Sequence, residues 1–194
     1  MIYSPVVFFN KSLQAPIYHP YSATEKGVYG YEGRGPFGAF NFDANDATVG
    51  RFPENKFLGD SYKNGSFPFW NPYKGVGEPI VSMFDAGQFF PYQILEDISP
   101  VKSWDFFFLG RLIIAGFFSF LFLRSLKLSF LDSFLGGIIY MFSGGFVWFI
   151  NTEAMVNAAM MIPILLLAIE MFLQNQSGLY IALSALSFGL ILVA

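Results

Sequence analysis

The sequence predicts an all-α protein that crosses a membrane several times. Hydrophobic residues make up 54% of the 194 residues, and charged residues make up only 13%. A soluble domain of this length carries about a quarter charged residues. The shortage of charge is concentrated in residues 105–194, whereas residues 1–104 hold most of the charged residues and most of the prolines. We therefore expect a polar loop region, residues 1–104, followed by a membrane region, residues 105–194.

The membrane region contains four apolar runs that we interpret as transmembrane helices. They are residues 106–123, 128–150, 154–173 and 179–194. About 20 helical residues cross the roughly 30 Å hydrocarbon layer, and none of these runs has the polar face of a soluble helix. Pro163 lies in the middle of the third run, where neighbouring helices, water or Ser/Thr groups can satisfy the carbonyl that a proline leaves free.

Basic residues predict the orientation. Arg124 and Lys127 flank the first short connection between runs, whereas the second connection, residues 151–153, contains Glu153 and no basic residue. Connections rich in Lys and Arg stay in the cytoplasm. We therefore expect a protein of the cytoplasmic membrane with residues 1–104 on its outer side. The first ten residues are not a signal peptide, and both ends look like interrupted helices, so we interpret the chain as a fragment of a longer polytopic protein.

Two short helices are expected in the outer region. Residues 52–64 have Pro53 at a first-turn position and stop before Gly65. Residues 87–98 place Phe90, Ile94 and Ile98 on one helical face. Both segments are too short to cross a bilayer and suit the membrane interface.

A rigid aromatic loop is expected between these helices. Residues 67–79 read FPFWNPYKGVGEP. This composition is too apolar for a flexible linker and too interrupted for a helix or a strand. Prolines fix φ, and glycines allow close backbone approach, so we expect a fixed loop that presents Trp70 and Tyr73.

The order of these segments resembles the N-terminal part of the bacterial YfhO-like membrane proteins, which belong to the GT-C superfamily of glycosyltransferases. The shared segments are FPFWNPYKGVGEP, an FFP segment, LGRLIIAGFFSFLFLRSLKLS, YMFSGG and NAAMMIPILLLAIE. The resemblance extends over about residues 41–173, and the WNPY…G-x-P block followed by FSG is its most specific part. It implies a GT-C-like fold, with a large first outer loop ahead of the four helices.

The resemblance also implies the reaction. Such enzymes transfer a sugar from a polyprenyl-phosphate-linked donor to an extracytoplasmic acceptor, which is a cell-envelope glycan or lipid. The implied acidic residue best fits Asp46, with Asp43 three positions earlier. A carboxylate here accepts the hydroxyl proton or holds a divalent cation, so Asp46 is the expected base and Asp43 its partner or a metal ligand. The alternative is that both are turn residues that bond their own backbone.

The candidate substrate-binding residues lie in the aromatic loop and the first apolar run. The rings of the loop stack on a sugar or anchor in the lipid headgroups, and an arginine within a span is a functional candidate by default. Arg111 either binds the lipid phosphate or extends to the headgroups, and Asp85 is a further candidate that could equally cap a helix. The full set is Arg111, Trp70, Asn71, Tyr73, Lys74 and Asp85.

Two other functional classes stay open. One is a transporter or flippase, which would place polar residues along several spans. The other is a non-catalytic accessory protein or fragment, because four spans cannot build a complete GT-C cavity, and this fragment alone is expected to be inactive. The single residue His19 and the absence of cysteine argue against a zinc site, and no glycine-rich nucleotide loop is present. We expect lipid and sugar partners and no nucleic acid.

Overall fold

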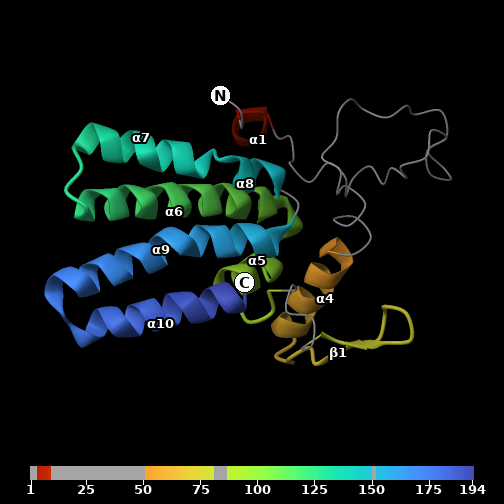
Figure 1. Cartoon of the computed structure of the whole chain (residues 1–194). Coiled ribbons are helices and arrows are strands. Elements are labelled where there is room, and N and C mark those ends of the chain that lie inside the picture. The colour runs from red at the N-terminus through yellow and green to blue at the C-terminus, as the bar shows by residue number, and fades with distance from the viewer. Residues whose placement is uncertain (1–3, 10–50, 81–86, 150–151) are drawn as a thin grey trace.

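The computed structural model describes residues 4–9, 51–80, 87–149 and 152–194, and within them the chain is mostly helical (Figure 1). The helices are α1 (Ser4–Phe9), α4 (Phe52–Lys63), α5 (Pro91–Asp97), the short 3-10 helix Val101–Ser103, α6 (Trp104–Ser125), α7 (Phe130–Met141), α8 (Gly144–Trp148), α9 (Glu153–Asn175) and α10 (Gly178–Leu192). One short hairpin, β1 (Trp70–Asn71) with β2 (Glu78–Pro79), completes the described elements.

The long apolar helices form a bundle. Helix α6 packs between α7 and α9, and α10 packs against the other side of α9 (Figure 1). The α6–α7 and α9–α10 connections lie at one end of this bundle, whereas α4 and the hairpin lie at the opposite end. The described polar segment, α4 with the hairpin, is thereby held at a single end of the apolar helices.

Two of the four expected spans have the length and composition to cross a membrane. They are Val101–Ser125, which includes α6, and Glu153–Asn175, which is α9. Helix α10 is apolar but shorter than a span. The run at residues 128–150 is not one helix, because it breaks after Met141 and resumes as α8 at Gly144. The break covers Phe142 and Ser143, directly before Gly144 and Gly145, and glycine loses more backbone entropy in a helix than any other residue.

The two short helices expected ahead of the apolar runs are present. Helix α4 begins one residue before Pro53 and ends before Gly65, whose φ of +69° is the left-handed conformation typical after a helix. Helix α5 is shorter than the expected 87–98. It starts at Pro91, because Gly87 has a φ of +60° and the backbone N–H of Phe90 closes a turn onto the Gly87 carbonyl.

Glycines set the distance between α6 and α7. A Cβ atom at Gly137 would lie 2.7 Å from the backbone oxygen of Gly116, and a Cβ at Gly116 would lie 3.0 Å from the sulfur of Met141. Small residues at such crossings let helices approach closely enough for backbone atoms to touch. This contact requires glycine at position 137.

Pro163 lies inside α9, and a neighbouring helix completes its broken hydrogen-bond ladder. Proline has no N–H, so the carbonyl of Ala159, four residues earlier, loses its helical donor. The hydroxyl of Tyr140 on α7 donates to that carbonyl at 2.9 Å. Of the partners expected for this carbonyl, namely a neighbouring helix, water or a Ser/Thr group, the structure shows the neighbouring helix.

We expect Tyr140→Phe to lower the free energy of unfolding by about 1 kcal/mol, since it leaves a carbonyl inside the bundle without a donor. In a Pro163→Ala background the same change should cost much less, because an alanine in place of the proline restores the N–H that bonds the Ala159 carbonyl. The measurement is equilibrium unfolding in detergent, with Tyr180→Phe as the matched control. Equal effects of Tyr140→Phe in the two backgrounds would contradict this role of the tyrosine hydroxyl.

Candidate functional site

The aromatic loop forms a β-hairpin rather than the strand-free loop that the sequence predicts. Trp70 pairs with Pro79, and Asn71 pairs with Glu78, in antiparallel register. The side-chain oxygen of Asn71 accepts a hydrogen bond from the backbone N–H of Tyr73 at 2.9 Å, which fixes the turn that follows β1. Interactions between neighbouring residues thus define this hairpin. Asn71 starts the turn, and Gly75 and Gly77 adopt the positive φ angles that close it.

The indole ring of Trp70 packs directly against the backbone of Gly77. The φ of this glycine is +93°, and a Cβ there would lie 2.6 Å from the ring. Any side chain at this position would therefore displace the ring as well as strain the backbone. The Trp and the Gly of the WNPY…G-x-P block are in this way a single packing unit.

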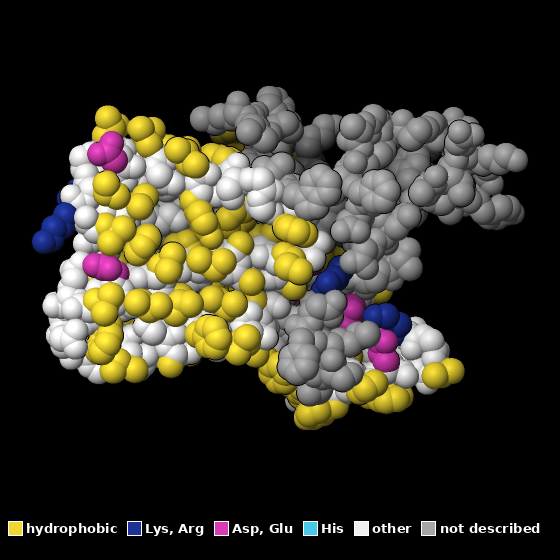
Figure 2. Space-filling view, in the orientation of Figure 1, with side chains coloured by type: hydrophobic (Ala, Val, Ile, Leu, Met, Phe, Trp, Pro, Cys, Tyr) yellow, Lys and Arg dark blue, Asp and Glu magenta, His cyan; other side chains and the backbone are white. Residues whose placement is uncertain are grey.

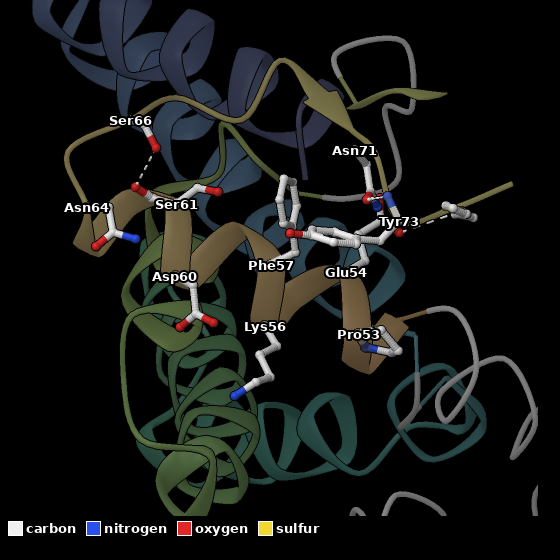
Figure 3. A pocket seen from close by; sticks show the side chains of 11 residues that line it. Pro53, Glu54, Lys56, Phe57, Asp60, Ser61, Asn64, Ser66, Asn71 and Tyr73 are labelled. Carbon is white, nitrogen blue, oxygen red and sulfur yellow. Dashed lines mark hydrogen bonds and ion pairs between the residues drawn. The ribbon is translucent and has the colours of Figure 1, made fainter. Parts of the chain in front are cut away.

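A cavity of about 560 Å³ lies between α4 and the hairpin (Figure 3). The rings of Phe57 and Tyr73 meet edge to face within it, with centroids 5.8 Å apart. The Tyr73 side chain is 83% exposed, so its ring is available to a ligand. The cavity is lined by Pro53, Glu54, Lys56, Phe57, Asp60, Ser61, Asn64, Ser66, Asn71, Tyr73 and Lys74.

The charges that line this cavity are balanced. Two are acidic, Glu54 and Asp60, and two are lysines, Lys56 and Lys74. The ammonium of Lys74 lies 2.9 Å from a Glu78 oxygen and 3.9 Å from a Glu54 oxygen. Because Lys74 is already neutralised by these carboxylates, the cavity suits a polar ligand without a large net charge, held by aromatic faces and hydrogen bonds.

The structure brings three of the predicted substrate-binding residues together in this cavity, namely Asn71, Tyr73 and Lys74. Trp70 does not line it, and Arg111 lies in a different, buried place. The predicted residues Asp43, Asp46 and Asp85, together with His19, lie outside the described residues.

Arg111 is the centre of a buried polar cluster. It is 1% exposed, and its Nη2 donates to Gln93 Oε1 at 2.8 Å and to the carboxylate of Glu96. Its Nε donates to Asn157 Oδ1 at 2.6 Å, and its guanidinium carbon lies 5.0 Å from the centre of the Tyr92 ring. Helices α5, α6 and α9 therefore meet at one arginine, whose Nε and Nη2 groups donate to side chains of the protein.

The cluster continues from Gln93 to Asp97. The Nε2 of Gln93 donates to Asp97 Oδ1 at 2.9 Å, and Asp97 is 3% exposed. Burial raises the pKa of Asp97 to about 8, although the bond from Gln93 opposes the shift. Burial also raises the pKa of Glu96, against the attraction of Arg111. Burial therefore favours the protonated form of the Asp97 carboxyl.

Sequence reasoning missed the partners of Arg111. Gln93, Glu96 and Asp97 occupy one face of α5 through their i, i+3 and i+4 spacing, and Asn157 lies on α9. The sequence-based prediction of α5 followed its apolar positions instead. The available signal was that an arginine within an apolar run needs a counter-charge, and Glu96 and Asp97 are the nearest carboxylates before Trp104.

Comparison with protein-family models, with curated proteins and with solved structures gives no match to this chain. Within the described residues, no three His, Cys, Asp or Glu side chains lie close enough to hold a metal ion. What the geometry defines is a helical protein with two helices long and apolar enough to cross a membrane, a buried ionic cluster, and an open cavity beside an aromatic hairpin.

Removing Arg111 should be more harmful than removing its whole ion pair. Arg111→Met leaves Glu96 buried without its cation, and we expect a loss of about 3–5 kcal/mol in the free energy of unfolding. The double variant Arg111→Met with Glu96→Leu should lose less than Arg111→Met alone, because no uncompensated charge remains. The exposed Arg124→Met, which loses only a bond to a backbone carbonyl, is the control.

Unfolding in detergent measures these differences, and each variant is compared at one pH, since Glu96 and Asp97 titrate. A double variant that is less stable than either single variant would contradict this account of the cluster.

Proposed function

We propose that this chain is part of an integral protein of the bacterial cytoplasmic membrane, similar to the YfhO-like members of the GT-C superfamily. In this proposal the full-length protein transfers a sugar from a polyprenyl-phosphate-linked donor to an extracytoplasmic glycan or lipid. The observation that carries it is the cavity between α4 and the hairpin, in which three residues of the aromatic loop lie beside carboxylates and a lysine.

The surface of the bundle supports a membrane environment. Large apolar side chains are exposed on its helices, including Phe106 and Ile113 on α6, Ile139 on α7 and Phe188 on α10. Figure 2 shows such side chains over the whole visible face of the bundle, with charged side chains near its two ends. An apolar surface of this extent would associate in water, whereas lipid chains cover it without cost.

The cavity supports the sugar-binding part of the proposal. A pyranose ring has apolar C–H faces and several hydroxyl groups, so it fits the ring of Tyr73 together with Asn71, Asn64 and Asp60 (Figure 3). In the proposed orientation this cavity opens at the outer end of the bundle, where a lipid-linked sugar and its acceptor would meet. The rings of the hairpin would then lie at the depth where aromatic residues gather in membranes.

The chemical step is assigned to the outer loop. We propose that Asp46 accepts the proton of the acceptor hydroxyl and that Asp43 orients Asp46 or contributes to holding a divalent cation. Binding of the sugar group of the donor is assigned to the cavity, with Asn71, Tyr73 and Lys74 as its contacts.

The orientation is tested by cysteine labelling in intact cells, since the chain has no cysteine of its own. Cysteines introduced at Ser66 and Thr152 should react with a membrane-impermeant reagent, and a cysteine at Ser125 should react only after permeabilisation. Ser66 follows α4, and Ser125 ends α6 at the other end of the bundle. The opposite labelling pattern would reverse the orientation and remove residues 1–104 from the outer side.

The reaction is tested with the full-length protein in membranes, using a radiolabelled polyprenyl-phosphate sugar. Asp46→Asn should lower the transfer rate by about 100-fold or more, because an amide keeps the size of the carboxylate but cannot accept the proton. Tyr73→Ala should raise KM by up to about tenfold with little change in kcat, because it removes a binding surface rather than a reacting group.

Val76→Ala, at the exposed tip of the hairpin and outside the cavity, is the control for Tyr73. Normal transfer by both Asp46→Asn and Asp43→Asn would exclude the proposed base. Movement of the lipid-linked sugar across the membrane without transfer would indicate a transporter instead.

A further inference from the structure

The buried cluster contains more acid than its arginine can neutralise. Glu96 and Asp97 are consecutive and both are almost fully buried, and among the described residues Arg111 is the cation that contacts Glu96. The guanidinium is committed to Glu96, Gln93 and Asn157. Asp97 receives one hydrogen bond, on Oδ1, and its Oδ2 is buried with no partner in the described part of the chain. A second buried carboxylate without a cation is strongly disfavoured.

The ionisable groups around Asp97 make its ionisation still less favourable. Glu96 on its own helix and Glu153 from α9 act on it as like charges. Asp97 in turn contributes to the raised pKa of Tyr62 on α4, after burial. Arg111 from α6 opposes the like charges but is paired with Glu96, and Asp105 on α6 adds a further negative group near Glu96. Burial, Glu96 and Glu153 therefore favour the protonated form of this carboxyl, whereas the hydrogen bond from Gln93 and the charge of Arg111 oppose it.

Asp97 also lies where α4 rests on the bundle. A Cβ atom at Gly59 of α4 would collide with the backbone oxygen of Asp97, so the two helices touch at this residue. The hydroxyl of Tyr62 on α4 donates to the backbone carbonyl of Gln88, just before α5, at 2.9 Å. Among the described helices and strands, α4 has its most extensive contact with α5. Helix α4 forms one wall of the cavity, and α4 packs on α5, the helix that contains Asp97.

We propose that Asp97 is a proton-binding site that holds α4, and with it the cavity, against the bundle. With the proton bound, the residue of α5 that touches α4 carries a neutral carboxyl, and the two helices stay in contact. When the proton leaves, an unpaired negative charge forms on the residue whose backbone touches Gly59 and whose carboxyl group acts electrostatically on Tyr62, and α4 separates to let water reach it. The site takes a proton as its ligand, so this inference goes beyond the proposed function and does not depend on what the cavity binds.

The direction of the pH dependence follows from the two states. With α4 in place, Asp97 holds its proton up to a pH of about 8, whereas a hydrated Asp97 has its ordinary pKa of 3.8. The closed state binds more protons between these values, so closing weakens as the pH rises. The opening constant of α4 should therefore rise by up to about tenfold per pH unit between about pH 5 and pH 8, and level off above about pH 9.

Hydrogen exchange of the full chain in detergent or nanodiscs tests this. The amides of α4 are followed between pH 5.5 and pH 9 as protection factors, which correct for the base catalysis of exchange itself. We expect the protection of α4 to fall across this range, while that of α9 changes much less. Asp97→Asn, which keeps the shape and stays neutral, should make the protection of α4 independent of pH. Asp132→Asn, at the start of α7, is the control and should retain the dependence.

A pH-independent protection of α4 in the unmodified protein would overturn the proposal, and so would an unchanged dependence in Asp97→Asn. If Asp97→Asn does not fold, the infrared spectrum of the unmodified protein decides. Aspartate labelled with ¹³C at its side-chain carboxyl should show the carbonyl band of a protonated acid at pH 6, and this band should disappear as the pH rises past about 8. Absence of the band at pH 6 would show that Asp97 is ionised and would also overturn the proposal.

Discussion

The burial of one guanidinium organises the junction between the polar and apolar parts of this molecule. Arg111 lies in an otherwise apolar helix, where an uncompensated arginine costs about 2.5–3.5 kcal/mol even on the insertion scale. Its donors reach Glu96 and Gln93 on α5 and Asn157 on α9. Three helices are thereby fixed relative to one another by a single side chain. Helix α5 in turn supports α4, and α4 with the hairpin forms the cavity, so the position of the cavity depends on this cluster.

The apolar bundle has a different source of order. The outward-facing side chains of the bundle are apolar, and one apolar side chain can replace another there, so these side chains do not determine which helices pack together. Specific contacts come from the few positions where size or hydrogen bonding matters, as at the glycine crossing of α6 and α7 and at the bond from Tyr140 to Ala159. In a lipid environment such contacts carry most of the specificity, because burying apolar surface between helices gives little advantage over burying it in lipid.

The features that sequence analysis predicted well are those that depend on neighbouring residues. Long apolar runs, the proline at the start of α4 and the glycine after it are local signals, and the structure contains the corresponding helices. The strands of the hairpin were missed because each has only two residues, and an Asn-initiated turn with a Trp–Gly contact defines them rather than alternation. The partners of Arg111 were missed because they are 15 to 46 residues away, so only the packing of three helices reveals them. For Asp43, Asp46 and Asp85 the assignments rest on the sequence alone.

The position of Lys74 between two carboxylates has a consequence for how the cavity responds to its surroundings. Charge pairs inside one site cancel at distances well below the Debye length, which is about 8 Å at physiological ionic strength. Added salt therefore has little effect on the electrostatic potential at the mouth of the cavity, because the charges there already cancel. A ligand recognised there through ring faces and hydrogen bonds would be bound about equally well in dilute and in concentrated media. Occupancy of the cavity would then follow the supply of ligand rather than the ionic strength of the medium.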